Sequence, residues 1–492
     1  MIKFGLDSLT TLLGETLKHS SEVEGNAMKQ VTFLSLMTVL GAVGAMQTPF
    51  WGVLLYYTLA VLRPQALWDW ALDGSIRWSL LAAIITLVSF WLHLSRLITR
   101  SAFNSMVTLF ILYSLLVMFS MITAFNPQIA QGWAIEYAKV MVIAVIASMV
   151  IEHFWQVRLL ALMILLMLGY IAWEINFLYF FQGGQLNIYH YGYGGLDNNG
   201  AGLLLAMGVP FAYCFAMSPV KGWLRWWPPV AALMGLILMH AILMTYSRGA
   251  MLATALGIIW VLIHHRPRWQ SGAAAVGLVM VLSVMAGPQI QQRFLSTAQY
   301  KTDASAQSRF ESWVAAWQIA WENPILGKGI RNSNQYTRNY GADFQGRTIH
   351  NQYLQIAADT GIPAVALYLL MLGFGMFNFR RGRLMCRDAL KDTQDDEVKR
   401  HIRHASQVCL ACQASLLIFI FDSMFLSLEM FETPWLLLVM AGVLPRAMQT
   451  HLDGLCAAKE DEPAHRTDPV KPASLTPAYS KPTLPGNTTH PV

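Results

Sequence analysis

Long apolar segments alternate with short polar connections along most of the chain. Several apolar runs approach the ~20 residues needed to cross the hydrocarbon core of a membrane. They lack the strict alternation of barrel strands, and helices satisfy their own backbone hydrogen bonds. The pattern predicts an all-α polytopic bundle of about 12–13 transmembrane helices, near residues 31–47, 49–63, 77–97, 104–125, 135–151, 157–179, 200–217, 227–246, 249–264, 272–287, 361–379, 407–426 and 433–448.

The composition agrees with a membrane protein. Hydrophobic residues make up 55% of the 492 residues and charged residues 13%, which excludes an ordinary soluble globular protein. The lipid bilayer, and no nucleic acid, is therefore the expected macromolecular environment. None of the five cysteines falls in the longest polar interruption, and no cluster of metal-ligating residues is evident. We expect no cofactor and no metal.

Basic residues in the connections predict the orientation. The segment from Arg380 to Arg403 has the highest density of Lys and Arg, so it is expected in the cytoplasm. Alternating outward from it places residues 183–199, Arg248 and residues 288–360 on the opposite side. These segments are therefore expected to face one compartment outside the cytoplasm.

The same reading divides the chain into six parts. Residues 1–30 form a leader that is either amphipathic on the membrane surface or mobile, because leucines recur there at helical spacing. The other parts are an N-terminal transmembrane region (31–189), a core (190–380) with its long outer loop (288–360), a basic cytoplasmic loop (381–406), a transmembrane hairpin (407–448) and a proline-rich, disordered cytoplasmic tail (449–492).

The long outer loop contains a predicted amphipathic helix. Phe310, Trp313, Trp317 and Trp321 recur at three- or four-residue spacing, typical of a helix that lies on the bundle or in the membrane interface. Residues 323–330 then contain a proline and two glycines. This turn is interpreted as a helix stop, with exposed amides that approach a phosphate as the alternative.

Five short motifs occur in an order that resembles the O-antigen ligase and polymerase superfamily, over roughly residues 190–380. They are Leu196-Asp-Asn-Asn-Gly200, Thr245-Tyr-Ser-Arg-Gly249, Ser308-Arg-Phe-Glu-Ser-Trp313, Asn323-Pro-x-x-Gly-x-Gly329 and His350-Asn-x-x-Leu354. The stretch from Tyr57 to Trp68 looks more specifically like O-glycosylation ligases of exosortase-associated exopolysaccharide clusters. The resemblance implies an enzyme with a GT-C-like fold and no metal ion. Such an enzyme transfers a glycan from undecaprenyl diphosphate to a lipid, glycan or protein acceptor.

The outer-face residues fit that chemistry. A diphosphate leaving group develops charge that must be stabilised, and guanidinium groups offer permanently charged, bidentate donors. Arg248 and Arg309 are the predicted diphosphate ligands, with Arg347 as a weaker third. For Arg248, the alternative is an interfacial arginine that fixes the depth of its helix.

His350 is the predicted general base, because an imidazole exchanges protons near neutral pH. Its alternative role is to cap the following helix or to bind a loop carbonyl. Asp197, Asn198 and Asn199 are expected to cap the helix that begins near Gly200, with sugar contact as a second role. Tyr246 and Asn351 complete the candidate substrate contacts.

Three functions fit this reading. A ligase transfers a finished glycan en bloc to an acceptor hydroxyl with inversion, a polymerase joins lipid-linked repeat units, and a transporter moves the lipid-linked sugar without chemistry. A transporter is disfavoured, because the sequence has no internal repeat of the transporter kind. The N-terminal likeness favours the ligase.

Overall fold

The computed structural model describes residues 28–72, 76–98, 104–181, 188–218, 220, 225–264, 304–341, 348–428 and 430–460. The first 27 residues, the predicted span at 272–287, Arg347 and the tail beyond 460 lie outside the described residues. Within them the protein is all-α, and the one β feature is an isolated bridge between Tyr193 and Leu196.

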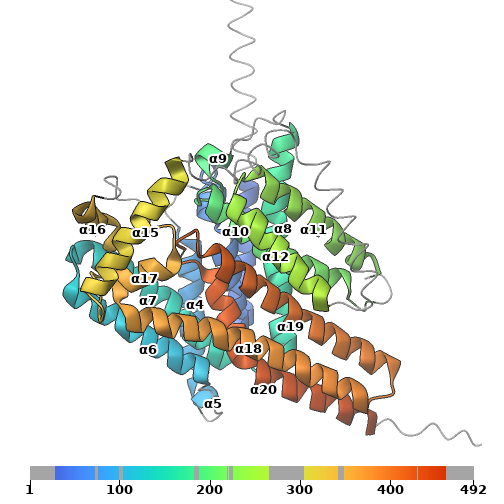
Figure 1. Ribbon diagram of the computed structural model, residues 1–492. Coiled ribbons are helices and arrows are strands. Elements are labelled where there is room, and N and C mark those ends of the chain that lie inside the picture. Colours follow the sequence, from blue (N-terminus) through green and yellow to red (C-terminus); the bar gives the residue numbers. More distant parts are fainter. Residues whose placement is uncertain are drawn as a thin grey trace, which may run out of the picture.

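A first helix covers Met28–Gln47. The labelled helices follow in chain order (Figure 1): α2 Pro49–Leu62, α3 Pro64–Leu67, α4 Trp78–Leu92, α5 Leu94–Ile98, α6 Ser105–Ser120, η1 Met121–Thr123, α7 Pro127–Val150, α8 Phe154–Phe181, α9 Ile188–Tyr191, α10 Asn198–Ala216, α11 Trp227–Met244, α12 Arg248–His264, α15 Ala304–Glu322, α16 Ser333–Tyr336, η4 Thr337–Tyr340, α17 Gln352–Thr360, α18 Ile362–Asp392, α19 Asp396–Asp422 and α20 Glu432–Glu460.

The chain is a multi-pass membrane protein. Eight described helices are long and apolar enough to cross a bilayer, and α4 and α12 are shorter apolar helices. Large apolar side chains such as Val88, Trp91 and Ile263 are exposed, as expected of a lipid-facing surface. The all-α polytopic fold is confirmed. The described residues contain fewer helices long enough to cross a bilayer than the 12–13 predicted.

Two segments differ from their predicted structure. The basic segment 381–406, expected as a loop, is mostly helix, because α18 continues to Asp392 and α19 begins at Asp396. Helix α20 likewise extends to Glu460, beyond the predicted end of its span at 448. Arg, Lys, Leu and Ala all favour helices, so a helix continues past the point at which its apolar stretch ends.

Helix α10 lies at the centre of the bundle, packed against α8, α11, α12 and α19. Its small residues allow close approach: a Cβ on Gly202 would lie 2.8 Å from the Ala250 Cβ and 3.0 Å from the Thr245 hydroxyl. This packing brings the start of α10 beside the turn between α11 and α12. That end of the bundle carries the candidate site and is called the site end below.

Helix α15 covers α17 at the site end (Figure 1). Its buried face is made of small and aliphatic residues such as Ala316 and Ile319. Its other face exposes Phe310, Trp317 and Trp321, while Trp313 points toward the bundle. The predicted amphipathic helix is present, and its exposed aromatic residues suit a membrane interface better than contact with the bundle.

Candidate functional site

Hydrogen bonds hold the start of α10 against the turn that leads into α12. Asp197 caps α10 by accepting from the Gly200 N–H (2.8 Å). The Asn198 side chain donates to the Thr245 carbonyl (3.2 Å), and the Ser247 hydroxyl donates to Asn199 Oδ1 (2.9 Å). The predicted cap is present, and the two asparagines fix the backbone immediately before Arg248.

Arg248 is the first residue of α12, and its side chain is half-buried. Tyr246, two residues earlier, has a left-handed backbone (φ 53°) and a half-buried ring. Burial raises the pKa of the Tyr246 hydroxyl, which keeps this group a neutral donor and acceptor. The turn therefore presents one permanent cation and one neutral hydroxyl.

The end of α19 places a buried carboxyl group between these elements. Gly249 packs so closely against Asp422 Oδ1 that a Cβ at position 249 would collide with it. Arg309 and Asp197 are both close enough to interact electrostatically with Asp422. Asp422 is 2% exposed, and its Oδ2 has no hydrogen-bond partner among the described residues. Asp422 thus joins the start of α10, the start of α12 and the helix that carries Arg309.

His350 is fixed by contacts of the residues on either side of it. The Trp313 indole N–H donates to the Ile349 carbonyl (3.0 Å), and the Gln352 N–H donates to the Ser423 carbonyl (2.9 Å). The backbone around His350 is therefore held between α15, which carries Arg309, and the end of α19, which carries Asp422. The His350 side chain is half-buried, and its Nε2 lies 3.4 Å from the Thr348 hydroxyl.

The residue that caps α17 is Asn351. Its side chain accepts from the Tyr353 and Leu354 N–H groups at 3.1 and 3.0 Å. His350 lies one position earlier with φ 54°, outside the helix. The N-cap of α17 is therefore Asn351 and not His350, and the substrate contact of Asn351 stays a prediction.

The turn after α15 packs against the end of α17. The amides of Lys328 and Gly329 donate to the carbonyls of Ala358 and Asp359 at 3.0 and 2.8 Å. Gly327 and Gly329 have positive φ, and a Cβ on Gly327 would lie 2.5 Å from the Ala358 carbonyl oxygen. The alternative that these amides approach a phosphate is wrong, because the end of α17 already accepts them.

Asp359 completes this contact, because its Oδ1 accepts from the Ser333 N–H (2.8 Å) and its Oδ2 from the Gln355 amide (3.3 Å). Burial raises the pKa of its carboxyl group. The pKa of Asp359 is therefore higher in the folded protein than in the unfolded protein. As the pH rises above about 4, ionisation of Asp359 lowers the free energy of unfolding.

We expect Asp359→Asn to be at least as stable as the native protein at neutral pH. The asparagine oxygen still accepts from Ser333, and Gln355 Oε1, which has no partner among the described residues, accepts from the new NH₂ after a flip of the Gln355 amide. Asp359→Ala instead leaves the Ser333 N–H unsatisfied and costs about 1–3 kcal/mol. Thermal unfolding in detergent measures both variants, and equal losses would contradict this account.

A cavity of about 500 Å³ adjoins the charged residues at the site end. Arg63, Arg331 and Glu432 line it, together with Leu196, the residue before Asp197. The sequence analysis did not select these charged residues. The Arg331 guanidinium stacks on Trp133, with its Cζ 4.6 Å from the ring centroid. The cavity is large enough for one or two sugar rings and offers the polar and aromatic groups that bind them.

Backbone conformation also marks this end of the molecule. Four described non-glycine residues have positive φ, and these are Arg63, Tyr246, Arg331 and His350. Arg63 and Arg331 line the cavity, Tyr246 lies two residues before Arg248, and His350 is the candidate base. Such conformations cost free energy and concentrate where side chains must point in a required direction for binding or catalysis.

Residues 230–369 match the family model of O-antigen ligase. A search of curated proteins finds no match to the chain. The family match confirms the resemblance to the O-antigen ligase and polymerase superfamily over this segment. The matched segment contains Tyr246, Arg248, Arg309 and His350. Three residues of the site end lie outside it: Asp197, Asp422 and Arg63, which stands between α2 and α3. The protein is therefore a membrane protein with a segment that is similar to O-antigen ligases.

Proposed function

We propose that the protein is a glycosyltransferase that moves a glycan from undecaprenyl diphosphate to an acceptor hydroxyl at the site end, which faces the periplasm across the bacterial inner membrane. The observation that carries the proposal is the convergence of three elements on Asp422 within a chain that matches the O-antigen ligase model. These elements are the start of α12 with Arg248, α15 with Arg309 and the segment before α17 with His350.

In the proposed reaction, the acceptor oxygen attacks the anomeric carbon of the donor glycan. The bond from that carbon to the phosphate oxygen breaks, and the diphosphate leaves with the electron pair. His350 takes the proton of the acceptor hydroxyl. Arg248 and Arg309 stabilise the negative charge on the leaving diphosphate, since fixed cationic donors act most strongly where charge develops. One displacement inverts the configuration at the anomeric carbon.

The charges of the site support this assignment of roles. Asp422 lies close enough to Arg309 for a favourable electrostatic interaction, and the unpartnered Oδ2 of Asp422 is able to accept from a sugar hydroxyl. The adjoining cavity with Arg63 and Arg331 is positioned to hold the sugars nearest the reacting bond. Among the described residues, no three His, Cys, Asp or Glu side chains come together as metal ligands.

The test is a reconstituted assay with an undecaprenyl-diphosphate-linked glycan as donor. We expect transfer to continue in EDTA, since the arginines supply the charge. Complete loss of transfer that Mg²⁺ restores would contradict the metal-free reaction. Failure to use any lipid-diphosphate donor under conditions where the protein stays folded would contradict the proposed function.

The product distinguishes a ligase from a polymerase. Cells that lack a ligase accumulate long glycans on the lipid carrier, because assembly is complete and only the final transfer fails. Cells that lack a polymerase accumulate single repeat units. We expect long chains, and single units would assign polymerase activity to the same site. The narrower likeness to O-glycosylation ligases of exosortase-associated clusters and the GT-C-like fold stay predictions.

A further inference from the structure

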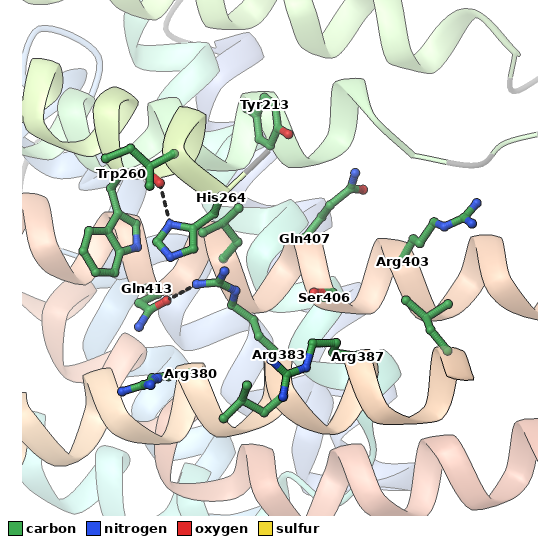
Figure 2. Close-up of a pocket in the computed structure, with 14 residues that line it drawn as sticks. Tyr213, Trp260, His264, Arg380, Arg383, Arg387, Arg403, Ser406, Gln407 and Gln413 are labelled. Atoms are coloured by element: carbon green, nitrogen blue, oxygen red, sulfur yellow. Dashed lines mark hydrogen bonds between the residues drawn. The ribbon is translucent and has the colours of Figure 1, made fainter. Parts of the chain in front are cut away.

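A second cavity, of about 800 Å³, lies between α10, α12, α18 and α19 (Figure 2). Four arginines line it, with Arg380, Arg383 and Arg387 from α18 and Arg403 from α19. Trp260 and His264 close one side from the end of α12, and Tyr213 reaches the cavity from α10. None of the proposed catalytic residues lines this cavity.

The cavity carries an excess of positive charge. None of its described lining residues is Asp or Glu. Arg383, the most enclosed of the four, donates to the neutral Gln413 side chain (2.8 Å), so this contact orients it without neutralising it. Arg387 contacts Asp388 at 3.7 Å, and both of these side chains are exposed. Several permanent cations gathered in one concavity repel each other unless an anion binds between them.

The position of the cavity indicates where that anion comes from. Helix α12 begins with Arg248 at the site end and ends with His264 in this cavity. Its 17 residues span about 25 Å, close to the thickness of a hydrocarbon core. The arginines therefore lie at the opposite membrane interface from the proposed active site, at the depth of lipid head groups.

An apolar groove adjoins the arginines on the membrane side. This groove has a volume of about 340 Å³, and its walls come from α10, α11 and α12 and include Gly235 and Gly257. Tyr213 lines both the arginine cavity and the groove, so the two meet at its ring. A ligand that fills both has a phosphate at one end and a hydrocarbon chain at the other.

We propose that the cavity is a binding site for an anionic membrane phospholipid. Arg383 and Arg403 bind its phosphodiester, Arg380 and Arg387 add positive charge, and one acyl chain occupies the groove beyond Tyr213. Basic pockets between transmembrane helices at the cytoplasmic interface bind such head groups. A free phosphate fits less well, because it would leave most of the cavity and the whole apolar groove empty.

The test compares two pairs of substitutions on the full chain in lipid nanodiscs. The cavity pair is Arg380→Gln with Arg403→Gln, since both side chains are exposed at the rim and their loss leaves the packing intact. The matched control is Arg381→Gln with Arg400→Gln, which removes the same charge from the same two helices at positions that do not line the cavity. Arg383→Gln is examined separately, because that side chain is half-buried.

Native mass spectrometry counts the phospholipids retained by protein from nanodiscs of equimolar phosphatidylcholine and phosphatidylglycerol. We expect the native protein and the control pair to retain phosphatidylglycerol, and the cavity pair to bind it about tenfold more weakly. Arg383→Gln should show at least the same loss. Phosphatidylcholine retention should be equal in all variants, since a zwitterionic head group brings no net charge.

Two results would overturn the proposal. One is equal phosphatidylglycerol retention by the cavity pair and the control pair. The other is a thermal stabilisation by inorganic phosphate in detergent as large as that by phosphatidylglycerol, which would make free phosphate the ligand. Neither measurement depends on glycan transfer, so the result stands apart from the proposed function.

Discussion

We expect that replacing His350 with asparagine strongly lowers glycan transfer while leaving the fold intact. An asparagine tolerates the left-handed backbone at this position (φ 54°) better than most residues, so the loop between α15 and α17 keeps its shape. The neighbouring contacts of Ile349 and Gln352 are made by backbone atoms and persist in the variant. Loss of the base lowers kcat by about 10²–10⁴-fold, measured in single-turnover transfer from the lipid-linked donor.

His190 is the matched control for this substitution. It is an exposed histidine of α9, a few residues before Asp197 and outside the group around Asp422. His190→Asn is expected to retain native kcat. Native thermal unfolding together with near-native turnover in His350→Asn would remove His350 from the chemistry. If His350→Asn instead unfolds at a clearly lower temperature than the native protein, His350 has a structural role. The backbone contacts of Ile349 and Gln352 predict no such loss of stability.

The sequence predicts the elements of the fold better than their ends. Spans such as α8, α10 and α11 are recognisable because their apolar runs are long and bounded by polar residues. The end of α18 is missed because the segment from Arg380 to Lys391 is rich in charged residues that still favour a helix. The hydropathy therefore falls before the helix stops. The aromatic spacing in α15 indicates a helix, but spacing alone does not distinguish its lipid face from its protein face.

For the site, the sequence identifies residues that belong to recognisable motifs and misses residues supplied by packing. Arg248, Arg309 and His350 stand in short motifs on one predicted face. Asp422 joins them only because α12 and α19 pack antiparallel through Gly249 and Gly257, which local sequence does not encode. Arg63 had a detectable signal, since an arginine between two apolar segments requires a partner or a function.

Arg309 is expected to have the second largest effect when substituted, and its position near Asp422 allows a decisive design. Arg309→Ala removes a proposed ligand of the leaving diphosphate, so transfer should fall by about 10²–10³-fold. It also removes the cation near a buried carboxyl group, which lowers stability. Adding Asp422→Asn removes that negative charge and should restore the thermal unfolding midpoint.

The double variant therefore separates stability from catalysis. If Arg309 binds the diphosphate, Arg309→Ala with Asp422→Asn is stable and inactive, and Arg248→Ala is inactive as well. Arg338→Ala, which removes an exposed arginine from η4 on the same face, should keep native transfer. Recovery of both stability and transfer in the double variant would instead make Arg309 a structural partner of Asp422, and Arg248 alone would then carry the charge of the leaving group.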